Sequence, residues 1–165
     1  MKKVVVILGL IIAGLHSCTN GQPGNSKKHI EDSKARQLND SAIKLIGKGG
    51  SYEQAILLLN KATEIDSDYF TAYWNKIAYQ NKLKKYSSAL KTATELNRLR
   101  PNMPEYYVTV GMLAEKTGDT ISCNKYYKDG LAHFNNILDT MNEKSKNYGT
   151  FMMDKAICRS VSTWK

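Results

Sequence analysis

The chain repeats itself at an interval of 34 residues, and this repeat limits what it can fold into more than any other feature. Sliding the sequence past itself by 34 positions brings small, aromatic and turn-forming residues into register three times. The aligned sets are Tyr52, Tyr86 and Thr120; Ala55, Ala89 and Cys123; Ile43, Ile77 and Gly111; and Ser67, Pro101 and Asn135. A fixed period of about 20 to 50 residues is typical of arrays in which each copy is one supersecondary unit. The sequence therefore predicts about three tandem copies of one small unit.

Each copy is expected to contain two amphipathic helices joined by a short turn. Apolar residues of the first copy recur at helical spacing, at Leu38, Ala42, Leu45 and Ile46 and then at Ala55, Ile56, Leu59, Ala62 and Ile65. Gly49 and Gly50 separate the two segments, and Ser51 is placed to cap the second helix. The predicted helices span residues 31–48, 51–65, 69–82, 86–99, 103–117 and 119–143, with a seventh at 148–159.

The pattern changes toward the C-terminus. One apolar stripe continues past the usual end of a second helix, through Leu131, Phe134, Ile137, Leu138 and Met141, and predicts an overlong sixth helix. Residues 144–165 are expected to form a partial fourth repeat or a capping helix with an irregular tail. Because terminal repeats normally need a polar outer face, an apolar half-unit favours self-association. The alternative is that the chain is truncated relative to its relatives.

These residues resemble the tetratricopeptide repeat family, whose pattern combines aromatic residues, a small residue in each helix and a proline at the end of the unit. The second copy matches best, with Tyr73, Ile77, Tyr86, Ala89, Ala93, Leu96 and Pro101. The first is weaker, since Asn39 stands where an aromatic residue is usual and Ile43 where a small one is. The resemblance covers residues 36–137 and implies an all-α fold, with tandem antiparallel helical hairpins stacked as a short right-handed superhelix (α-solenoid). Residues 31–143 are assigned to three such hairpins.

The resemblance also implies a binding face, because in that family the first helix of each hairpin lines an inner surface that binds peptides. The matching positions are Asp40, Lys44 and Lys48; Trp74, Ala78, Asn81 and Lys82; and Val108, Met112 and Lys116. Trp74 and Met112 would supply apolar contact, Asn81 could hydrogen-bond an extended backbone, and the lysines would attract carboxylates. The predicted partner-binding residues are Lys44, Lys48, Trp74, Asn81, Lys82, Met112 and Lys116. The competing interpretation makes Trp74 a core aromatic and the lysines a solvated face.

The charge of the chain points to an acidic partner. The formal net charge is +9, and removing Lys2 and Lys3 leaves +7. Residues 70–103 carry seven Lys or Arg residues against Glu95, a local +6, so the second hairpin is expected to hold a basic band. A protein or peptide is the favoured partner and an anionic envelope polymer the alternative. Nucleic acid is a poor explanation if the chain is exported from the cytoplasm, as its N-terminus predicts below.

The N-terminus predicts export and lipid attachment. Lys2 and Lys3 precede an uncharged apolar run over residues 4–15, which has the layout of a signal peptide and is too short to span a membrane. The run ends in Leu15-His16-Ser17-Cys18, which resembles the lipobox of bacterial lipoproteins. The resemblance implies a signal peptide at 1–17, a diacylglyceryl or acyl lipid on Cys18, a tether over 18–30 and anchoring in the cell envelope, at the outer membrane. Ordinary cleavage and release of a soluble protein is the alternative.

No constellation of residues predicts catalysis, a metal or a further cofactor. His29 and His133 have no second ligand at helical spacing, and Cys123 falls at a small, packed position of a helix. A Cys123–Cys158 disulfide is possible in an oxidising compartment. The sequence therefore predicts a binding scaffold rather than an enzyme. The alternatives are an accessory module for an enzyme complex or a polymer, or an inert fragment.

Overall fold

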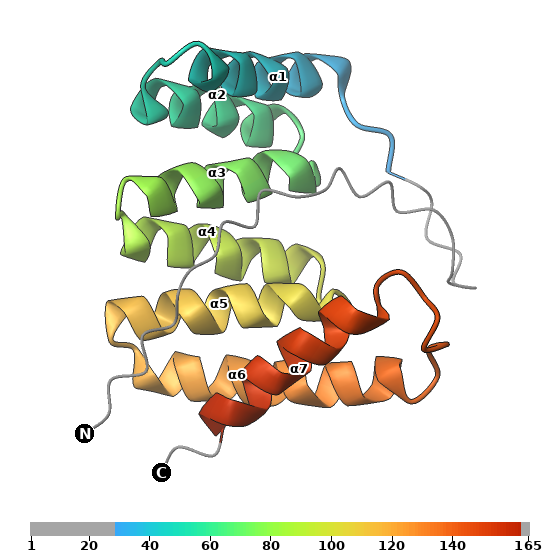
Figure 1. Cartoon of the computed structure of the whole chain (residues 1–165). Helices are drawn as coiled ribbons and strands as arrows, with labels where there is room; N and C mark the ends of the chain where they lie inside the picture. Colours follow the sequence, from blue (N-terminus) through green and yellow to red (C-terminus); the bar gives the residue numbers. More distant parts are fainter. Residues whose placement is uncertain (1–28, 163–165) are drawn as a thin grey trace.

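The computed structural model describes residues 29–162, and within this range the chain consists of helices and connecting turns. In chain order they are α1 (Ser33–Gly47), α2 (Tyr52–Ile65), α3 (Phe70–Lys82), α4 (Tyr86–Leu99), α5 (Pro104–Thr117), α6 (Thr120–Leu138) and α7 (Tyr148–Ser162) (Figure 1). The all-α helical-repeat solenoid expected from the 34-residue period is confirmed. The predicted signal peptide and Cys18 lie outside the described residues.

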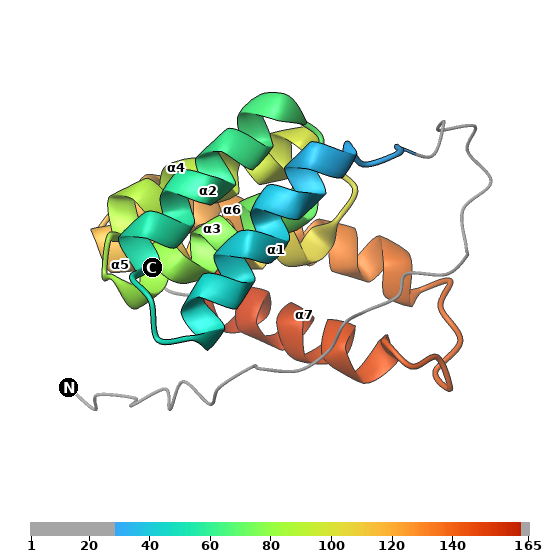
Figure 2. The same cartoon turned by 90° about the horizontal axis from the view of Figure 1, so that it is seen from above.

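The helices stack as antiparallel neighbours in two layers (Figures 1 and 2). The first helices of the three hairpins, α1, α3 and α5, form one layer, and α2, α4 and α6 form the other. From α1 to α6, each helix packs against the helix before it and the helix after it. The last helix, α7, lies obliquely across α6 and also contacts α5, so it covers part of the first-helix layer at the third hairpin.

Polar side chains set the starts of several helices. Ser51 precedes α2, and its Oγ accepts hydrogen bonds from the backbone N–H groups of Glu53 at 3.1 Å and Gln54 at 3.5 Å. Asp119 precedes α6, and its carboxylate accepts from the N–H of Ser122 at 3.0 Å. These bonds satisfy donors that the first turn of a helix leaves unpaired. The capping role predicted for Ser51 is confirmed.

The core consists of three clusters that follow one another along the stack. The equivalent small residues Ala55, Ala89 and Cys123 are all buried, which lets paired helices approach closely. Gly111 shows how close the approach is, since a Cβ atom at this position would lie 3.0 Å from the ring of Tyr127. The small positions of the repeat are therefore fixed by packing.

The sixth helix is long, as predicted, but it ends earlier than expected. It has 19 residues and stops at Leu138, whereas the apolar stripe predicted a helix to residue 143. Thr140 donates a hydroxyl hydrogen bond to the carbonyl of Ile137 at 3.1 Å, and the side-chain oxygen of Asn142 accepts from the N–H of Lys144 at 2.9 Å. Such local side-chain bonds favour turns over helix. Met141 therefore lies in a turn before α7.

Candidate functional site

The residues predicted to bind a partner lie on the layer formed by α1, α3 and α5. Lys44 in α1 and Lys48 just after it are exposed, as are Trp74 and Lys82 in α3, while Asn81 is half-buried. The structure therefore places these five residues on the first two hairpins, within the layer that the resemblance assigned to ligands.

Trp74 is a surface residue rather than a core aromatic. Its side chain is 44% exposed, and its ring centroid lies 5.8 Å from that of Tyr106 in α5, with the rings tilted by 39°. One side of the indole therefore rests on the third hairpin while the rest remains accessible. A large aromatic side chain held in this way offers apolar contact area at low entropic cost.

The third hairpin contributes less to this face than predicted, because α7 covers it. Val108 occupies the position equivalent to Asp40 and Trp74, yet it is only 5% exposed and shares a buried cluster with Cys158 of α7. Met112 is half-buried and packs against the same cluster. The prediction that Val108 lies on an open binding face was wrong. Helix α7 packs against α6 and α5 and buries Val108. The open face is thus confined to α1, α3 and the end of α5.

Two carboxyl groups lie where α7 meets α5. Glu105, in the first turn of α5, is largely buried, and its Oε2 has no hydrogen-bond partner among the described residues. Burial raises the pKa of Glu105. Burial, and then the charge of Glu105, raises the pKa of Asp154 in α7 to about 6. The contact between the two helices therefore favours protonated carboxyls.

Three of the seven basic residues of the second hairpin lie within salt-bridge distance of carboxylates. Lys85 lies 3.9 Å from Glu53, Arg98 lies 2.7 Å from Glu95, and Arg100 lies 3.3 Å from Asp68. Lys76 is half-buried, and burial lowers its pKa although the charge of Glu64 opposes this. The local charge of +6 counted along the sequence is reduced in the structure, because Glu53 and Asp68 of the first hairpin pair with two of these basic residues.

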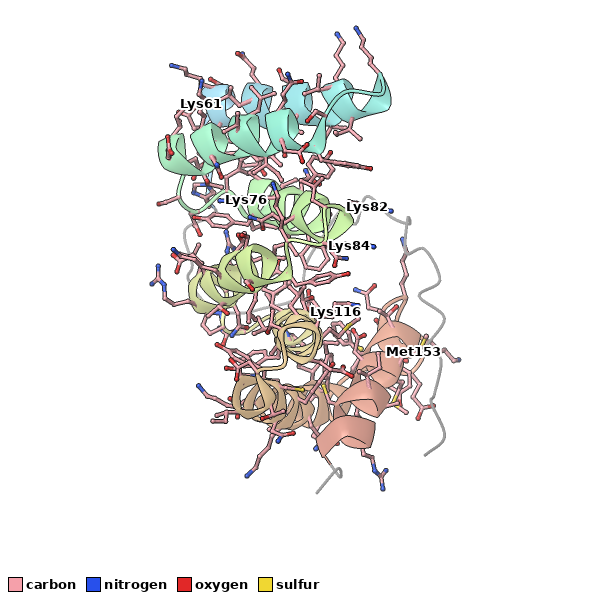
Figure 3. All side chains as sticks on the ribbon, turned by 90° about the vertical axis from the view of Figure 1, so that its left-hand side faces the viewer. Lys61, Lys76, Lys82, Lys84, Lys116 and Met153 are labelled. Atoms are coloured by element: carbon pink, nitrogen blue, oxygen red, sulfur yellow. The ribbon has the colours of Figure 1, made fainter. Side chains whose placement is uncertain are left out.

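Four other lysines form a row that crosses the hairpins, which we call the basic edge: Lys48, Lys82, Lys84 and Lys116. All four are exposed at the C-terminal ends of α1, α3 and α5, and no carboxylate of the described chain lies within salt-bridge distance of them. Figure 3 looks onto these ends and labels Lys82, Lys84 and Lys116. The Nζ of Lys116 lies 5.2 Å from the ring centroid of Tyr86, a cation–π contact. Lys84 was counted in the basic band of the sequence but not among the predicted binding residues, because it stands outside the first helices of the hairpins.

The two cysteines of the folded part are free thiols. Cys123 and Cys158 are both buried in the cluster beneath α7, and no disulfide joins them. Burial raises the pKa of the Cys158 thiol to about 12 and raises that of Cys123 as well. Since the thiolate is the reactive form, these side chains serve as packing groups.

A hollow of about 310 Å³ lies elsewhere, between α2, the end of α3 and the start of α4. It is lined by Glu53, Ile56, Leu57, Gln80, Lys85 and Ser88. None of the predicted binding residues lines it. Within residues 29–162 no three metal-binding side chains come together, and no helix combines the length and apolarity needed to cross a membrane.

Two layers of antiparallel helices with one open face define a helical-repeat solenoid. No protein-family model matches the chain. Similarity to individual known proteins nevertheless indicates which type of helical repeat it contains. Tetratricopeptide repeat protein 28 of Homo sapiens is 28% identical over 99 residues, which are 60% of this chain and 4% of the human protein. Heat shock protein STI1 of Saccharomyces cerevisiae is 31% identical over 96 residues, 58% of this chain and 15% of the yeast protein. The chain thus spans a small part of either relative.

Solved structures agree on the type of repeat. PcrH from Pseudomonas aeruginosa superposes with a TM-score of 0.61 at 12% identity, covering 82% of this chain and 96% of PcrH. PcrH bound to the chaperone binding region of PopD gives 0.59 at 13% identity, over 77% of this chain and 90% of PcrH. The TPR2B domain of yeast Sti1, in complex with pHsp70, gives 0.58 at 11% identity, over 78% of this chain and 98% of the domain. The fold is therefore of the tetratricopeptide repeat type.

Proposed function

We propose that the protein is a lipid-anchored scaffold of the bacterial cell envelope that binds an acidic polypeptide segment on the face formed by α1 and α3. The exposed indole of Trp74, on the same layer of helices as Lys44, Lys48 and Lys82, is the observation that carries this proposal. Accessible tryptophan side chains are enriched in binding hot spots.

The comparisons support binding rather than catalysis. The Sti1 domain was solved with pHsp70 and PcrH with a region of PopD, so similar helical stacks hold other polypeptides. This chain would use its open face in the same general way. It would act by holding a partner, without a catalytic step.

The envelope location in this proposal rests on the N-terminal sequence. The apolar run over residues 4–15 and the Leu15-His16-Ser17-Cys18 sequence after it support export and acylation, and the residue after Cys18, which is not acidic, favours the outer membrane. Metabolic labelling with a radioactive fatty acid tests this part. The native chain should incorporate label and a Cys18→Ala variant should not; a variant that stays labelled refutes Cys18 as the acylation site.

Capture of the partner tests the binding face. Affinity-tagged wild-type chain and a Trp74→Ala/Lys82→Ala variant would be used to recover proteins from solubilised envelopes, followed by mass spectrometry. A Lys128→Ala variant, altered at an exposed lysine of α6, serves as the control. We expect the double variant alone to lose specific partners. The same partners at equal yield from all three would sink the proposal, and recovery only of an anionic polymer would favour the alternative ligand.

Self-association through the C-terminal helix is a separate part of the proposal. α7 buries Cys158 against α6 but leaves Met152 43% exposed and Met153 70% exposed. We expect the apparent mass in sedimentation equilibrium to rise with concentration, and a Met152→Gln/Met153→Gln variant to abolish the rise. A concentration-independent monomer would refute it.

A further inference from the structure

The basic edge has the regularity of a repeated binding position. Lys48, Lys82 and Lys116 are separated by 34 residues, so the stacking of hairpins brings one lysine from each to the same end of its first helix. Helix C-termini favour basic residues through the helix dipole, which accounts for one lysine per helix. It does not account for Lys84, which lies beyond the end of α3.

Lys84 also has an unfavourable backbone conformation. Its φ is +57°, in the left-handed region, whereas the equivalent residue of the third hairpin is Gly118, with a φ of +77°. Glycine adopts this conformation without strain, but a residue with a Cβ does not. The turn therefore does not need a lysine, and its presence beside Lys82 adds a positive charge at the expense of stability.

None of the four lysines of the basic edge has a carboxylate partner in the described part of the chain, whereas three other basic residues of the second hairpin do. Lys85, Arg98 and Arg100 each have a carboxylate within 4 Å, while no described carboxylate reaches Lys48, Lys82, Lys84 or Lys116. Lysine ammonium groups on flexible stems suit separate carboxylates, because each can adjust independently. An acidic chain would supply the counter-charge that the described residues do not provide.

We infer that the basic edge binds an extended acidic polypeptide that runs across the ends of α1, α3 and α5, with acidic residues placed at the interval between hairpins. The inference rests on the proposed function and adds the ligand's path and the role of Lys84. It commits to a polypeptide because the lysines recur once per hairpin at the ends of α1, α3 and α5, an arrangement that a single extended chain can follow.

The test measures binding of a fluorescein-labelled decaglutamate peptide to the full mature chain by fluorescence anisotropy, with decaglutamine as the neutral probe. Separate Lys48→Gln, Lys82→Gln, Lys116→Gln and Lys84→Gly variants are compared with Lys91→Gln and Lys128→Gln, which remove exposed lysines of α4 and α6. We expect each edge variant to weaken decaglutamate binding roughly three- to tenfold and each control by less than about twofold. Lys84→Gly should do so without lowering the Tm.

Equal losses in edge and control variants would show unspecific charge attraction and overturn the inference. Tighter binding to vesicles containing phosphatidylglycerol than to decaglutamate, with the same dependence on the edge, would overturn it in favour of a lipid surface. Capture repeated with a single Trp74→Ala variant and with the edge variants separates this result from the proposed function. A partner that requires Trp74 but ignores the edge variants leaves the scaffold standing and removes only the path proposed here.

Discussion

Asn75 of α3 donates a hydrogen bond from Nδ2 to Oδ1 of Asn39 in α1 across 2.8 Å, and Asn39 is only 2% exposed. The bond joins the first helices of two hairpins through residues 36 positions apart. If a buried side-chain oxygen loses its hydrogen-bond donor, the full desolvation cost of that oxygen is no longer compensated. The pair therefore fixes how the first hairpin sits on the second.

Replacing the donor tests this role. An Asn75→Ala variant should be destabilised by about 1–3 kcal/mol, because it leaves the Asn39 oxygen buried and unpaired. Urea denaturation followed by circular dichroism measures the change. An Asn124→Ala variant, at an exposed position of α6, should lose less than about 0.5 kcal/mol. Equal losses in both would contradict a specific role for the pair.

The close packing under α7 predicts opposite effects for two glycines. A Cβ at Gly130 would lie 3.0 Å from Cβ of Tyr107 and 3.2 Å from Sγ of Cys158, while nothing lies within 4 Å of one at Gly149. Gly130→Ala should lower the free energy of unfolding by about 1–3 kcal/mol through overpacking. Gly149→Ala, in the first turn of α7, should have no effect or stabilise slightly through helix propensity. Denaturant titration of both variants measures these changes. A Gly130→Ala variant as stable as the native chain would mean that α7 packs more loosely than described.

The carboxyls between α5 and α7 predict a pH dependence. Folding raises the pKa of Asp154 from 3.8 to about 6, so the folded state favours its protonated form. The resulting stabilisation is fully present below pH 3.8 and is lost as pH rises through about 6. An Asp154→Asn variant should therefore be more stable than the native chain at pH 7.5, on the order of 1 kcal/mol after solvent screening, and this advantage should shrink at pH 5.

Urea denaturation at the two pH values measures this advantage. Asp139→Asn, at an exposed residue just after α6, is the control and should show no comparable gain. An advantage of Asp154→Asn that is the same at both pH values would rule out titration of Asp154 as its cause.

The strained turn at Lys84 predicts a gain in stability from glycine alone. Lys84→Gly should raise the free energy of unfolding by up to about 1 kcal/mol, because it removes the Cβ that makes a φ of +57° unfavourable. Lys84→Ala removes the same charge but keeps the Cβ, so it should give little or no gain. Thermal denaturation of both separates backbone strain from charge repulsion; an equal gain in both would point to repulsion.

The repeat carried most of the information about the fold. Period, apolar spacing and capping residues such as Ser51 placed every described helix, because these are local features. The residue at position 39 was interpreted as a departure from the repeat pattern. The structure explains Asn39 by its hydrogen bond with Asn75, which lies 36 residues further along the chain. A pattern read over neighbouring residues cannot reveal such a bond. The position of α7 was equally non-local, since its apolar stripe predicts a buried face but not which helices bury it.

The binding face was predictable in position but not in composition. Repeat register placed Trp74 and Lys82 on the open layer, whereas the burial of Val108 depends on α7. Counting charge along residues 70–103 overestimated the basic band, because Glu53 and Asp68 of the first hairpin neutralise Lys85 and Arg100. Lys84 could have been found by comparing turns, since a lysine there stands in register with Gly118.

The placement of α7 over Val108 sets a limit on ligand length. A short segment can lie along α1 and α3 without meeting α7, but a longer one that continues onto the middle of α5 must displace it and expose the cluster around Cys158. A longer ligand therefore gains binding free energy from its extra contacts, but detaching α7 offsets part of that gain. The same array would thus discriminate between partners by reach as well as by charge.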